Sequence, residues 1–588
     1  MRYRLPVPIT ATAAIATIAA FFSTACMARS TSTAPTRTPQ RSDAGAVAPA
    51  LRTAADSFLA IQRPQSTGIV WADLADSTRL RARARVDRVA SMLRAIDRTS
   101  LTRPAEQLLY DNLRETTESS IGTRMCRTHL WAISNQFSGW HVAASNTARV
   151  QPVGTDAARD RALAVFRALP EAIVAERAIL QRGLDSGYTA SRDVVAAVVR
   201  QYDDLLPDDP TRSPLYAPAN RDGTAAFRIA WRALLADTIY PAARAHQTFL
   251  RDQYAARARA EGSMSALPDG VNCYAASLRA QTSMPVDVDT ILRNARRDMD
   301  RVTAQLAPLV RELTGEADVS RGVIQLRVDP RFTFPSRDSV LLAYRAMTRR
   351  AEGLIGKVVS GFTPESIVVA PYPEFQERAN LPPQYLRAPD DNSRPAQFLV
   401  NLGRTERMSV ANAAAHEAYP GHHLQRIAAR HAAGVHPVMQ TLSFGGFSEG
   451  WGIYSERLAD EMGLYESKLD RAGYLVHLLD VMVAAYLDVG YHTRGWTRQD
   501  LADTMVVLGG RPRAMAEAYA DRHAATPGQL ATYYIGFQAI SSNREQAERA
   551  LGARFRAPEF HHEVLRDGTI TLASLGAKVN RWITARRQ

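Results

Sequence analysis

The stretch His416-Glu-Ala-Tyr-Pro-Gly-His-His423 carries three histidines and a glutamate within eight residues. A second stretch, Phe447-Ser-Glu-Gly-Trp451, supplies another glutamate, Glu449, 27 residues after His422. Neutral imidazoles and carboxylates are the usual ligands of catalytic Zn²⁺, and a glutamate beside a ligating histidine can accept a proton from water. The two stretches therefore predict a metal centre, and polar surface histidines are the simpler alternative.

The spacing of the histidines departs from the HExxH pattern, in which the two ligands lie one helical turn apart. Position i+4 from His416 is Pro420, and the next imidazoles are His422 and His423. Because Pro420 removes a helical hydrogen bond and Gly421 tolerates unusual dihedral angles, we expect a kink or bulge here. A two-residue bulge would bring His422 to the effective i+4 position, so we favour His422 as the ligand and keep His423 as the alternative.

The predicted ligands are therefore His416, His422 and Glu449, which leave a fourth position open for water, as catalysis requires. Glu417 would act as the general base and then protonate the leaving amine. Glu456 follows Glu449 by seven residues, broadly on the same helical face. It could accept a hydrogen bond from the ring nitrogen of a ligating histidine that does not bind the metal. A helix-pairing carboxylate is the alternative role for Glu456.

Hydrolysis also needs a group that stabilises the oxyanion of the tetrahedral intermediate, and candidates lie downstream. They are His492, in DVGYH (488–492), and Tyr533, in PGQLATYYIG (527–536). Arg522 could bind a substrate carboxylate through two parallel hydrogen bonds. A structural role is the alternative for each of these three residues.

Helical periodicity dominates the chain, with apolar residues every three or four positions and charged residues between them. The predicted helices span Ile69–Ile96, Asp156–Leu184, Thr224–Ala260, Val288–Leu313, Ser336–Val359, Met408–Ala433, Phe447–Glu461, Lys468–Tyr491 and Gly528–Leu551. The predicted strands span Val323–Val328, Ser366–Pro371 and Gln397–Asn401, the last as either a peptide-binding edge strand or an ordinary buried strand. We therefore expect a mainly α fold, a large multi-helix domain of zinc-peptidase type with a small β-sheet near the active site.

We expect this single domain to span residues 51–588, with a scaffold in its N-terminal half and the metal site within about 267–588.

The start of the chain has the pattern of an export signal, because two arginines precede an uncharged apolar run that ends in Ser-Thr-Ala-Cys26. It resembles a bacterial lipoprotein signal, in which Cys26 is acylated; a plain signal peptide is the alternative. We expect a signal over 1–26 and a flexible tether over 27–50, rich in Ser, Thr, Ala and Pro.

Composition limits the partners of the protein. The net charge is +13, but only three of the 72 basic residues are lysines, and the arginines are interleaved with Asp and Glu along the chain. We therefore expect no nucleic-acid partner.

Cys126 and Cys273 remain after Cys26 and could form a disulfide or stay as two free thiols. No later run reaches about 18 uncharged apolar residues, so we expect no transmembrane helix.

The motifs together resemble the bacterial domain-of-unknown-function 885 family, over about residues 267–568. The segments that carry the resemblance are LPDG (267–270), NSRP (392–395), HEAYPGHHLQ (416–425), EGWGIYSE (449–456), DVGYH (488–492), PGQLATYYIG (527–536) and the stretch 560–568. This resemblance implies a zinc metallopeptidase with a large α-helical fold, often exported as a lipoprotein.

We therefore expect a metallopeptidase with one Zn²⁺ per chain that hydrolyses short peptides in the cell envelope. Its location would be periplasmic, with a lipid anchor at the outer membrane as its only membrane contact. The alternatives are an amidase acting on peptidoglycan stem peptides and a metal-binding envelope lipoprotein without catalytic activity. The presence of Glu417 favours a hydrolase, because a pure binder needs no general base.

Overall fold

A computed structural model describes residues 48–62, 71, 74–134, 138–372, 377, 382–388 and 394–588. The expected signal peptide, its Cys26, most of the tether, and Asn392 and Ser393 lie outside these residues. Helix α1 (Pro49–Gln62) begins two residues before the expected domain start. Of the described residues, 74% are helical, and the sheet is small and three-stranded, which confirms the mainly α fold.

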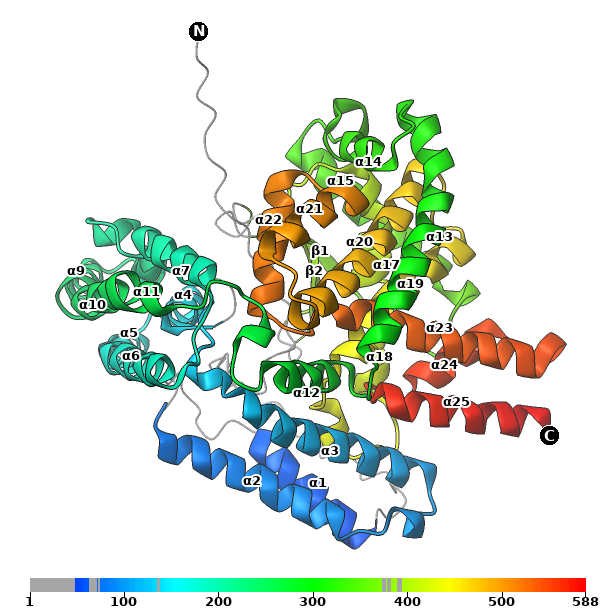
Figure 1. The fold of residues 1–588 in the computed structure, drawn as a ribbon, viewed down its shortest axis with the longest axis horizontal. Helices are drawn as coiled ribbons and strands as arrows, with labels where there is room; N and C mark the ends of the chain where they lie inside the picture. The colour runs from blue at the N-terminus through cyan, green and yellow to red at the C-terminus, as the bar shows by residue number, and fades with distance from the viewer. Residues whose placement is uncertain are drawn as a thin grey trace.

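The first helices form two groups (Figure 1). Helices α1, α2 (Asp76–Arg94) and α3 (Pro104–Gly122) pack side by side. The second group contains α4 (Trp140–Val150), α5 (Asp156–Arg167), α6 (Leu169–Ser186), α7 (Arg192–Leu205), α8 (Ala217–Arg221), α9 (Ala225–Leu234), α10 (Tyr240–Thr248) and α11 (Ala255–Arg257). The single helix predicted over Asp156–Leu184 is wrong, because α5 ends just before Pro170, which lacks a backbone N–H.

A disulfide joins the first group to the helices that follow it. Cys126 ends the short 3₁₀ helix η2 (Thr123–Cys126) after α3, and it is bonded to Cys273 in α12 (Gly270–Thr282). The two cysteines lie 147 positions apart in the sequence, so the bond closes a long loop of chain. Of the two possibilities left open by the sequence, the structure shows the disulfide.

The buried helix α20 (Lys468–Thr493) is the centre of the C-terminal part, where α13 (Val288–Thr314) and α23 (Ala531–Leu551) pack against it (Figure 1). By length and composition α20 is apolar enough to cross a membrane, but 89% of its apolar window is buried inside the protein. Its hydrophobic surface is therefore explained by helix packing. The predicted strand Val323–Val328 is wrong, because it lies in α14 (Val319–Val328), which the Asp318 side chain caps.

The sheet contains β1 (Ile367–Pro371), β2 (Gln384–Leu386) and β3 (Ala396–Val400) in the order β1-β3-β2. Strand β3 pairs in parallel with β1 and antiparallel with β2, so it lies in the middle of the sheet. The edge-strand interpretation of Gln397–Asn401 is therefore wrong, and the buried-strand alternative is confirmed. The two edges belong to β1 and β2.

The site is built on helices that surround this sheet and α20. They are α15 (Arg337–Leu354), α17 (Val410–Glu417), α18 (His422–His431) and α19 (Gly445–Met462), followed by α21 (Arg498–Gly509), α22 (Arg513–Ala525), α24 (Ala557–Leu565) and α25 (Leu572–Arg587). Helix α17 packs on α15, α19 and α20, and α19 packs on α23. These contacts bring segments from across the C-terminal half to one place.

Candidate metal centre

A break between two helices positions the histidines. Helix α17 ends at Glu417 and α18 begins at His422, with a cis peptide bond at Tyr419–Pro420 between them. Gly421 packs directly on the backbone carbonyls of α17, where a Cβ atom would clash. The expected bulge within one helix is therefore a full break, which brings the rings of His416 and His422 to 4.8 Å between centroids.

Helix α19 is tied to this break by two hydrogen bonds. The Trp451 indole N–H donates to the Pro420 carbonyl at 2.9 Å, and the Ser455 hydroxyl donates to the Ala415 carbonyl at 3.0 Å. Both bonds are buried, so they fix how α19 lies against α17. Glu449, near the start of α19, is thereby held opposite the histidines.

Two glycines of the EGWG motif allow this close approach. Gly450 packs against the backbone of Gly536 in α23. Gly452 faces His416, and a Cβ atom there would lie 2.5 Å from its Cε1 atom and 2.6 Å from its Nε2 atom. The motif therefore combines one candidate ligand with the small residues that give the neighbouring imidazole its space.

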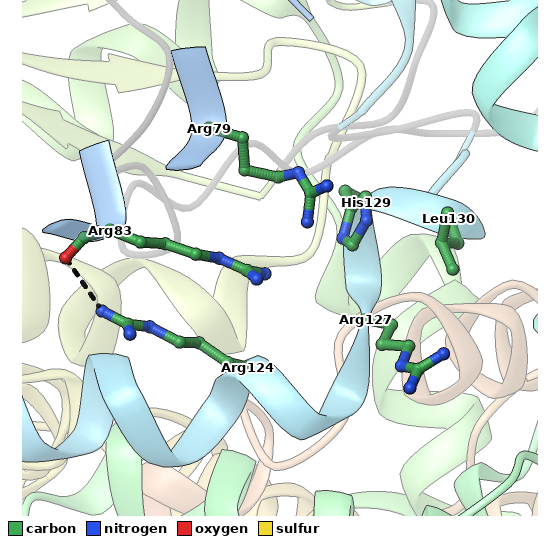
Figure 2. Close-up of a pocket in the computed structure, with 6 residues that line it drawn as sticks. All are labelled: Arg79, Arg83, Arg124, Arg127, His129 and Leu130. Atoms are coloured by element: carbon green, nitrogen blue, oxygen red, sulfur yellow. Dashed lines mark hydrogen bonds between the residues drawn. The ribbon is translucent and has the colours of Figure 1, made fainter. Parts of the chain in front are cut away.

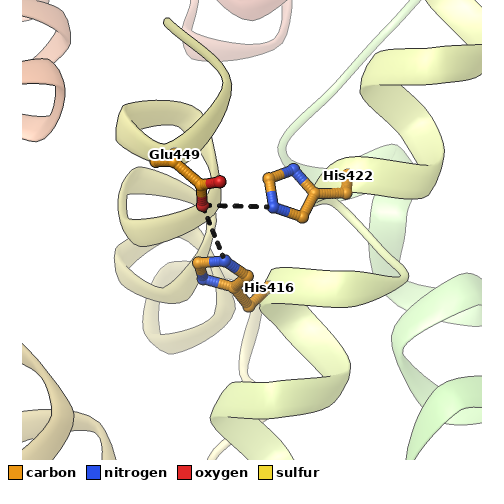
Figure 3. Close-up of side chains that lie close together, drawn as sticks. All are labelled: His416, His422 and Glu449. Carbon is orange, nitrogen blue, oxygen red and sulfur yellow. Dashed lines mark ion pairs between the residues drawn. The ribbon is translucent and has the colours of Figure 1, made fainter. Parts of the chain in front are cut away.

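His416, His422 and Glu449 point toward one another from three different helices (Figure 3). The Nε2 atoms of His416 and His422 lie 3.8 Å and 3.6 Å from Glu449 Oε2, and all three ligand atoms lie within 4.8 Å of one another. Ligands at about 2.0–2.1 Å from a tetrahedral Zn²⁺ stand roughly 3.4 Å apart. The two His–Glu449 distances are therefore within a few tenths of an ångström of this value, and the 4.8 Å span of the set would have to contract further around one metal ion.

The outer nitrogen of each imidazole is already engaged. His416 Nδ1 lies 2.9 Å from Glu456 Oε1, and His422 Nδ1 lies 3.4 Å from Gln425 Oε1. Because these acceptors engage Nδ1, Nε2 is the nitrogen of each imidazole that faces Glu449. Burial lowers the pKa of His416, but Glu449 and Glu456 more than offset it and raise that pKa well above its ordinary value, so a metal ion would replace a proton at Nε2. Glu456 lies behind His416, at the position that its spacing predicted.

The two buried glutamates of the site differ in their electrostatic environment. Burial raises the pKa of Glu449, but His416 and His422 more than offset it and hold that pKa well below its ordinary range. Burial also raises the pKa of Glu417, and here the histidines do not fully offset it. Glu449 is therefore suited to remain a charged ligand, and Glu417 to exchange a proton.

Glu417 also contacts the sheet. Its Oε2 atom accepts a hydrogen bond from the backbone N–H of Tyr385, in edge strand β2, at 2.8 Å. This hydrogen bond helps to fix the orientation of the Glu417 carboxylate beside His416. The edge nearest to the predicted chemistry is therefore β2 and not β3.

Tyr533 and Arg522 lie in the same region. Burial raises the pKa of the Tyr533 hydroxyl, the nearby Glu449 carboxylate raises it further, and Arg522 acts in the opposite direction. Arg522 is buried and donates to Gln529 Oε1 at 2.9 Å, while its Nε–H has no partner among the described residues. The Tyr533 hydroxyl and the Arg522 guanidinium, whose Nε–H is available to donate, therefore lie near the candidate metal ligands.

His492 and His423 are placed elsewhere. His492 Nδ1 accepts from the Met264 N–H at 3.0 Å and Nε2 donates to the His523 carbonyl at 3.1 Å, so neither ring nitrogen is free for an oxyanion. This corrects the catalytic role that we predicted for His492. His423 contacts the Glu365 carbonyl at 2.9 Å and the Tyr385 hydroxyl at 3.3 Å, which leaves His422 as the histidine of the cluster.

Some contributors were missed by sequence reasoning. His477, on α20, places Nδ1 at 2.9 Å from both oxygens of Glu456, which therefore bridges His416 and His477. No local motif marks His477, because its partner lies 21 residues earlier on another helix. Gln425 had a usable signal, since it follows His422 by three residues on one helical face.

The comparisons with known proteins fit this fold. The chain belongs to the family described as bacterial protein of unknown function (DUF885), whose profile matches residues 65–579 and so confirms the resemblance. No curated protein matches the chain.

Two solved structures have a similar fold. One is described as a candidate lipoprotein from Colwellia psychrerythraea, with 20% identity, a TM-score of 0.80 and coverage of 91% of this chain and 99% of that chain. The other is a candidate lipoprotein of unknown function from Shewanella oneidensis, with 18% identity, a TM-score of 0.69 and coverage of 90% and 96%. At these identities the similarity shows the fold alone.

Proposed function

We propose that this protein is a zinc-dependent metallopeptidase that hydrolyses short peptides in the cell envelope. The observation that carries the proposal is the convergence of His416, His422 and Glu449 on one point, with Glu417 beside them. Three ligands with an adjacent carboxylate match the requirements of a catalytic rather than a purely structural zinc site.

The residues present fit one Zn²⁺ per chain. His416 and His422 would bind it through Nε2, and Glu449 through a carboxylate oxygen, with Glu456 supporting the first imidazole. When bound, such a cation would polarise the substrate carbonyl and make water more acidic. The remaining chemistry belongs to side chains of the protein.

Glu417 would accept the proton of the attacking water and transfer it to the leaving amine. Its raised pKa makes it a stronger base than an ordinary carboxylate, and the Tyr385 N–H holds it in place. The Tyr533 hydroxyl would donate to the oxyanion of the intermediate. The unused Nε–H of Arg522 suits a substrate carboxylate, which would be provided by a short peptide.

The location is part of the same proposal. Cys26 would be acylated and would anchor the protein at the periplasmic side of the outer membrane, through the Ser- and Pro-rich segment that follows it. The two similar structures are both described as candidate lipoproteins, which supports this proposal. Peptides of the envelope would then be the accessible substrates.

Cleavage of a mixed peptide library by the zinc-loaded wild type and by Glu417→Gln tests the function. Gln keeps the shape of the side chain but cannot accept a proton, so we expect cleavage to fall by about 10²–10⁴-fold while zinc content is unchanged. The control is Glu545→Gln, an exposed glutamate on α23, which should cleave like the wild type.

Equal cleavage by the wild type and Glu417→Gln would exclude Glu417 as the base. Absence of cleavage by the zinc-loaded wild type on every peptide would favour the metal-binding lipoprotein without catalytic activity. Cleavage restricted to peptidoglycan stem peptides would favour the amidase.

A further inference from the structure

A positively charged pocket is lined by residues between 79 and 130, far along the sequence from the candidate metal ligands. It has a volume of about 320 Å³ and lies between α2 and the short helices after α3. Its lining residues are Arg79, Arg83, Arg124, Arg127, His129 and Leu130. Figure 2 shows the guanidinium groups of Arg79 and Arg83 pointing toward the His129 ring. Five of these six side chains carry basic groups.

Few carboxylates balance these cations. Asp76 pairs with Arg79 at 2.7 Å and with the adjacent Arg182 at 3.3 Å. Asp87 pairs with Arg124 at 2.8 Å. Within the described ranges, neither Arg83 nor Arg127 has a carboxylate partner, so five arginines face two carboxylates.

The like charges act on one another. Burial lowers the pKa of Arg83, and the neighbouring Arg79 and Arg124 lower it further. Burial lowers the pKa of His129 to about 4, and Arg79 and Arg83 add to this effect. Both pKa values are lowered, as expected where the electrostatic potential is positive. A bound anion would reduce this positive potential.

The backbone holds these groups in place. Arg127 adopts a left-handed conformation (φ 42°) between η2 and the next 3₁₀ helix, Thr128–Leu130. Its neighbour Cys126 is fixed by the disulfide to Cys273, and the Cys126 carbonyl accepts from the Trp131 indole at 2.9 Å. The Arg127 guanidinium lies over the Tyr188 ring, 5.2 Å from its centroid. The backbone of the loop and the Arg127 side chain are therefore held in place before an anion binds.

The Arg83 and Arg124 side chains lie beside each other across the pocket (Figure 2). An Arg124 amino group donates to the Arg83 backbone carbonyl at 3.3 Å, which holds η2 against α2. The two side chains run in opposite directions, so the Arg83 guanidinium points away from Arg124, toward Arg79 and His129 (Figure 2). The guanidinium groups of Arg79 and Arg83, which point to the same place, can together hold a tetrahedral oxyanion through several N–H groups.

We propose that this pocket binds a phosphate group. Guanidinium forks match phosphate oxygens, and a phosphate carries more charge than a single carboxylate with which to balance Arg83 and Arg127, which have no carboxylate partner among the described residues. The volume admits a phosphate with a small substituent, either the headgroup of an anionic phospholipid or a soluble phosphate compound. This proposal is independent of the metal centre and of any peptidase activity.

Calorimetric titration of the full-length protein tests the proposal with four ligands at constant ionic strength. Inorganic phosphate and glycerol 3-phosphate represent soluble phosphates, glycerophosphoglycerol represents a phospholipid headgroup without acyl chains, and acetate represents a simple carboxylate. We expect at least one phosphate ligand to bind at least about tenfold more tightly than acetate, because charged hydrogen bonds add to the affinity. Tighter binding of the diester would indicate a lipid source, and tighter binding of the monoesters a soluble source.

Arg83→Ala is the test variant and Arg85→Ala its matched control, since both remove one positive charge from α2 and place a good helix former there. Arg85 is exposed and does not line the pocket. We expect Arg83→Ala to weaken phosphate binding by about tenfold or more and Arg85→Ala to leave it within about twofold. Equal weakening by both variants, or no preference of the wild type for any phosphate over acetate, would overturn the proposal.

Discussion

Replacement of Gly452 by alanine should damage the metal centre without unfolding the protein. The new Cβ atom would lie 2.5 Å from His416 Cε1 and 2.6 Å from His416 Nε2, whereas ordinary contacts begin at 3.4 Å. One of the two groups must therefore retreat by about 0.9 Å. Helix α19 cannot move freely, because Trp451 and Ser455 bind it to the α17–α18 break.

The His416 ring is therefore the group that yields. Its Nε2 atom would leave the point that it shares with His422 and Glu449 by close to an ångström, which is large against a metal–nitrogen bond of about 2.0–2.1 Å. Changes in the groups that orient a ligand cost about 10–100-fold in metal affinity, and we expect this displacement to reach the upper end. A 100-fold loss corresponds to about 2.7 kcal/mol.

Competition with a zinc chelator measures the affinity, and thermal unfolding of the metal-free protein measures the fold. Gly353→Ala on α15 is the control, because its Cβ atom would meet nothing within 4 Å, and alanine stabilises a helix by about 0.5–1 kcal/mol over glycine. Unchanged zinc affinity in Gly452→Ala would show that His416 does not hold the metal in this orientation.

Three further predictions concern the support of the site, the pH response and the anchor. Glu456→Gln should lower zinc affinity by about tenfold, because an amide is a weaker acceptor for His416 Nδ1–H; an unchanged affinity in the chelator competition would contradict this. Burial lowers the pKa of His561 to about 3 and that of His492 to about 4, so their folded forms resist protonation. The free energy of unfolding of the metal-free protein should therefore be intact above about pH 6.5 and fall below it, by about 1.4 kcal/mol per pH unit for each histidine, as urea unfolding at pH 7, 6 and 5 can measure; a flat profile would refute it. Cys26→Ser should abolish labelling with a radioactive fatty acid, and labelling equal to that of the wild type would exclude the anchor.

The long helices could be predicted because their apolar periodicity extends over several turns. The prediction over Val288–Leu313 differs from α13 by a single residue at its end, and Lys468–Tyr491 differs from α20 by two. Short segments gave errors. Val323–Val328 contains β-branched residues in a six-residue run, and periodicity alone cannot separate such a run from a buried helix. The order of the strands depends on partners distant in the chain, so the central position of β3 could not be inferred locally.

The candidate site was predictable where residue chemistry and spacing coincide. Pro420 and Gly421 mark the interruption between His416 and His422, and the EGW stretch marks Glu449, so the sequence indicated three side chains that converge in the structure. Glu456 was indicated by its seven-residue spacing from Glu449. The error over His492 has a different origin. Its position near a motif said nothing about its hydrogen bonds to two backbone groups, which only tertiary packing creates.

The central claim is that His416, His422 and Glu449 hold one catalytic cation, and zinc content per chain tests it most directly. Elemental analysis of the purified protein should give about one Zn²⁺ for the wild type and a large loss in His416→Ala, His422→Ala and Glu449→Ala, since each leaves two protein ligands. His423→Ala is the matched control, because this adjacent histidine contacts Tyr385 and Glu365 instead. Full zinc occupancy in the three ligand variants, or loss in His423→Ala with retention in His422→Ala, would contradict the account.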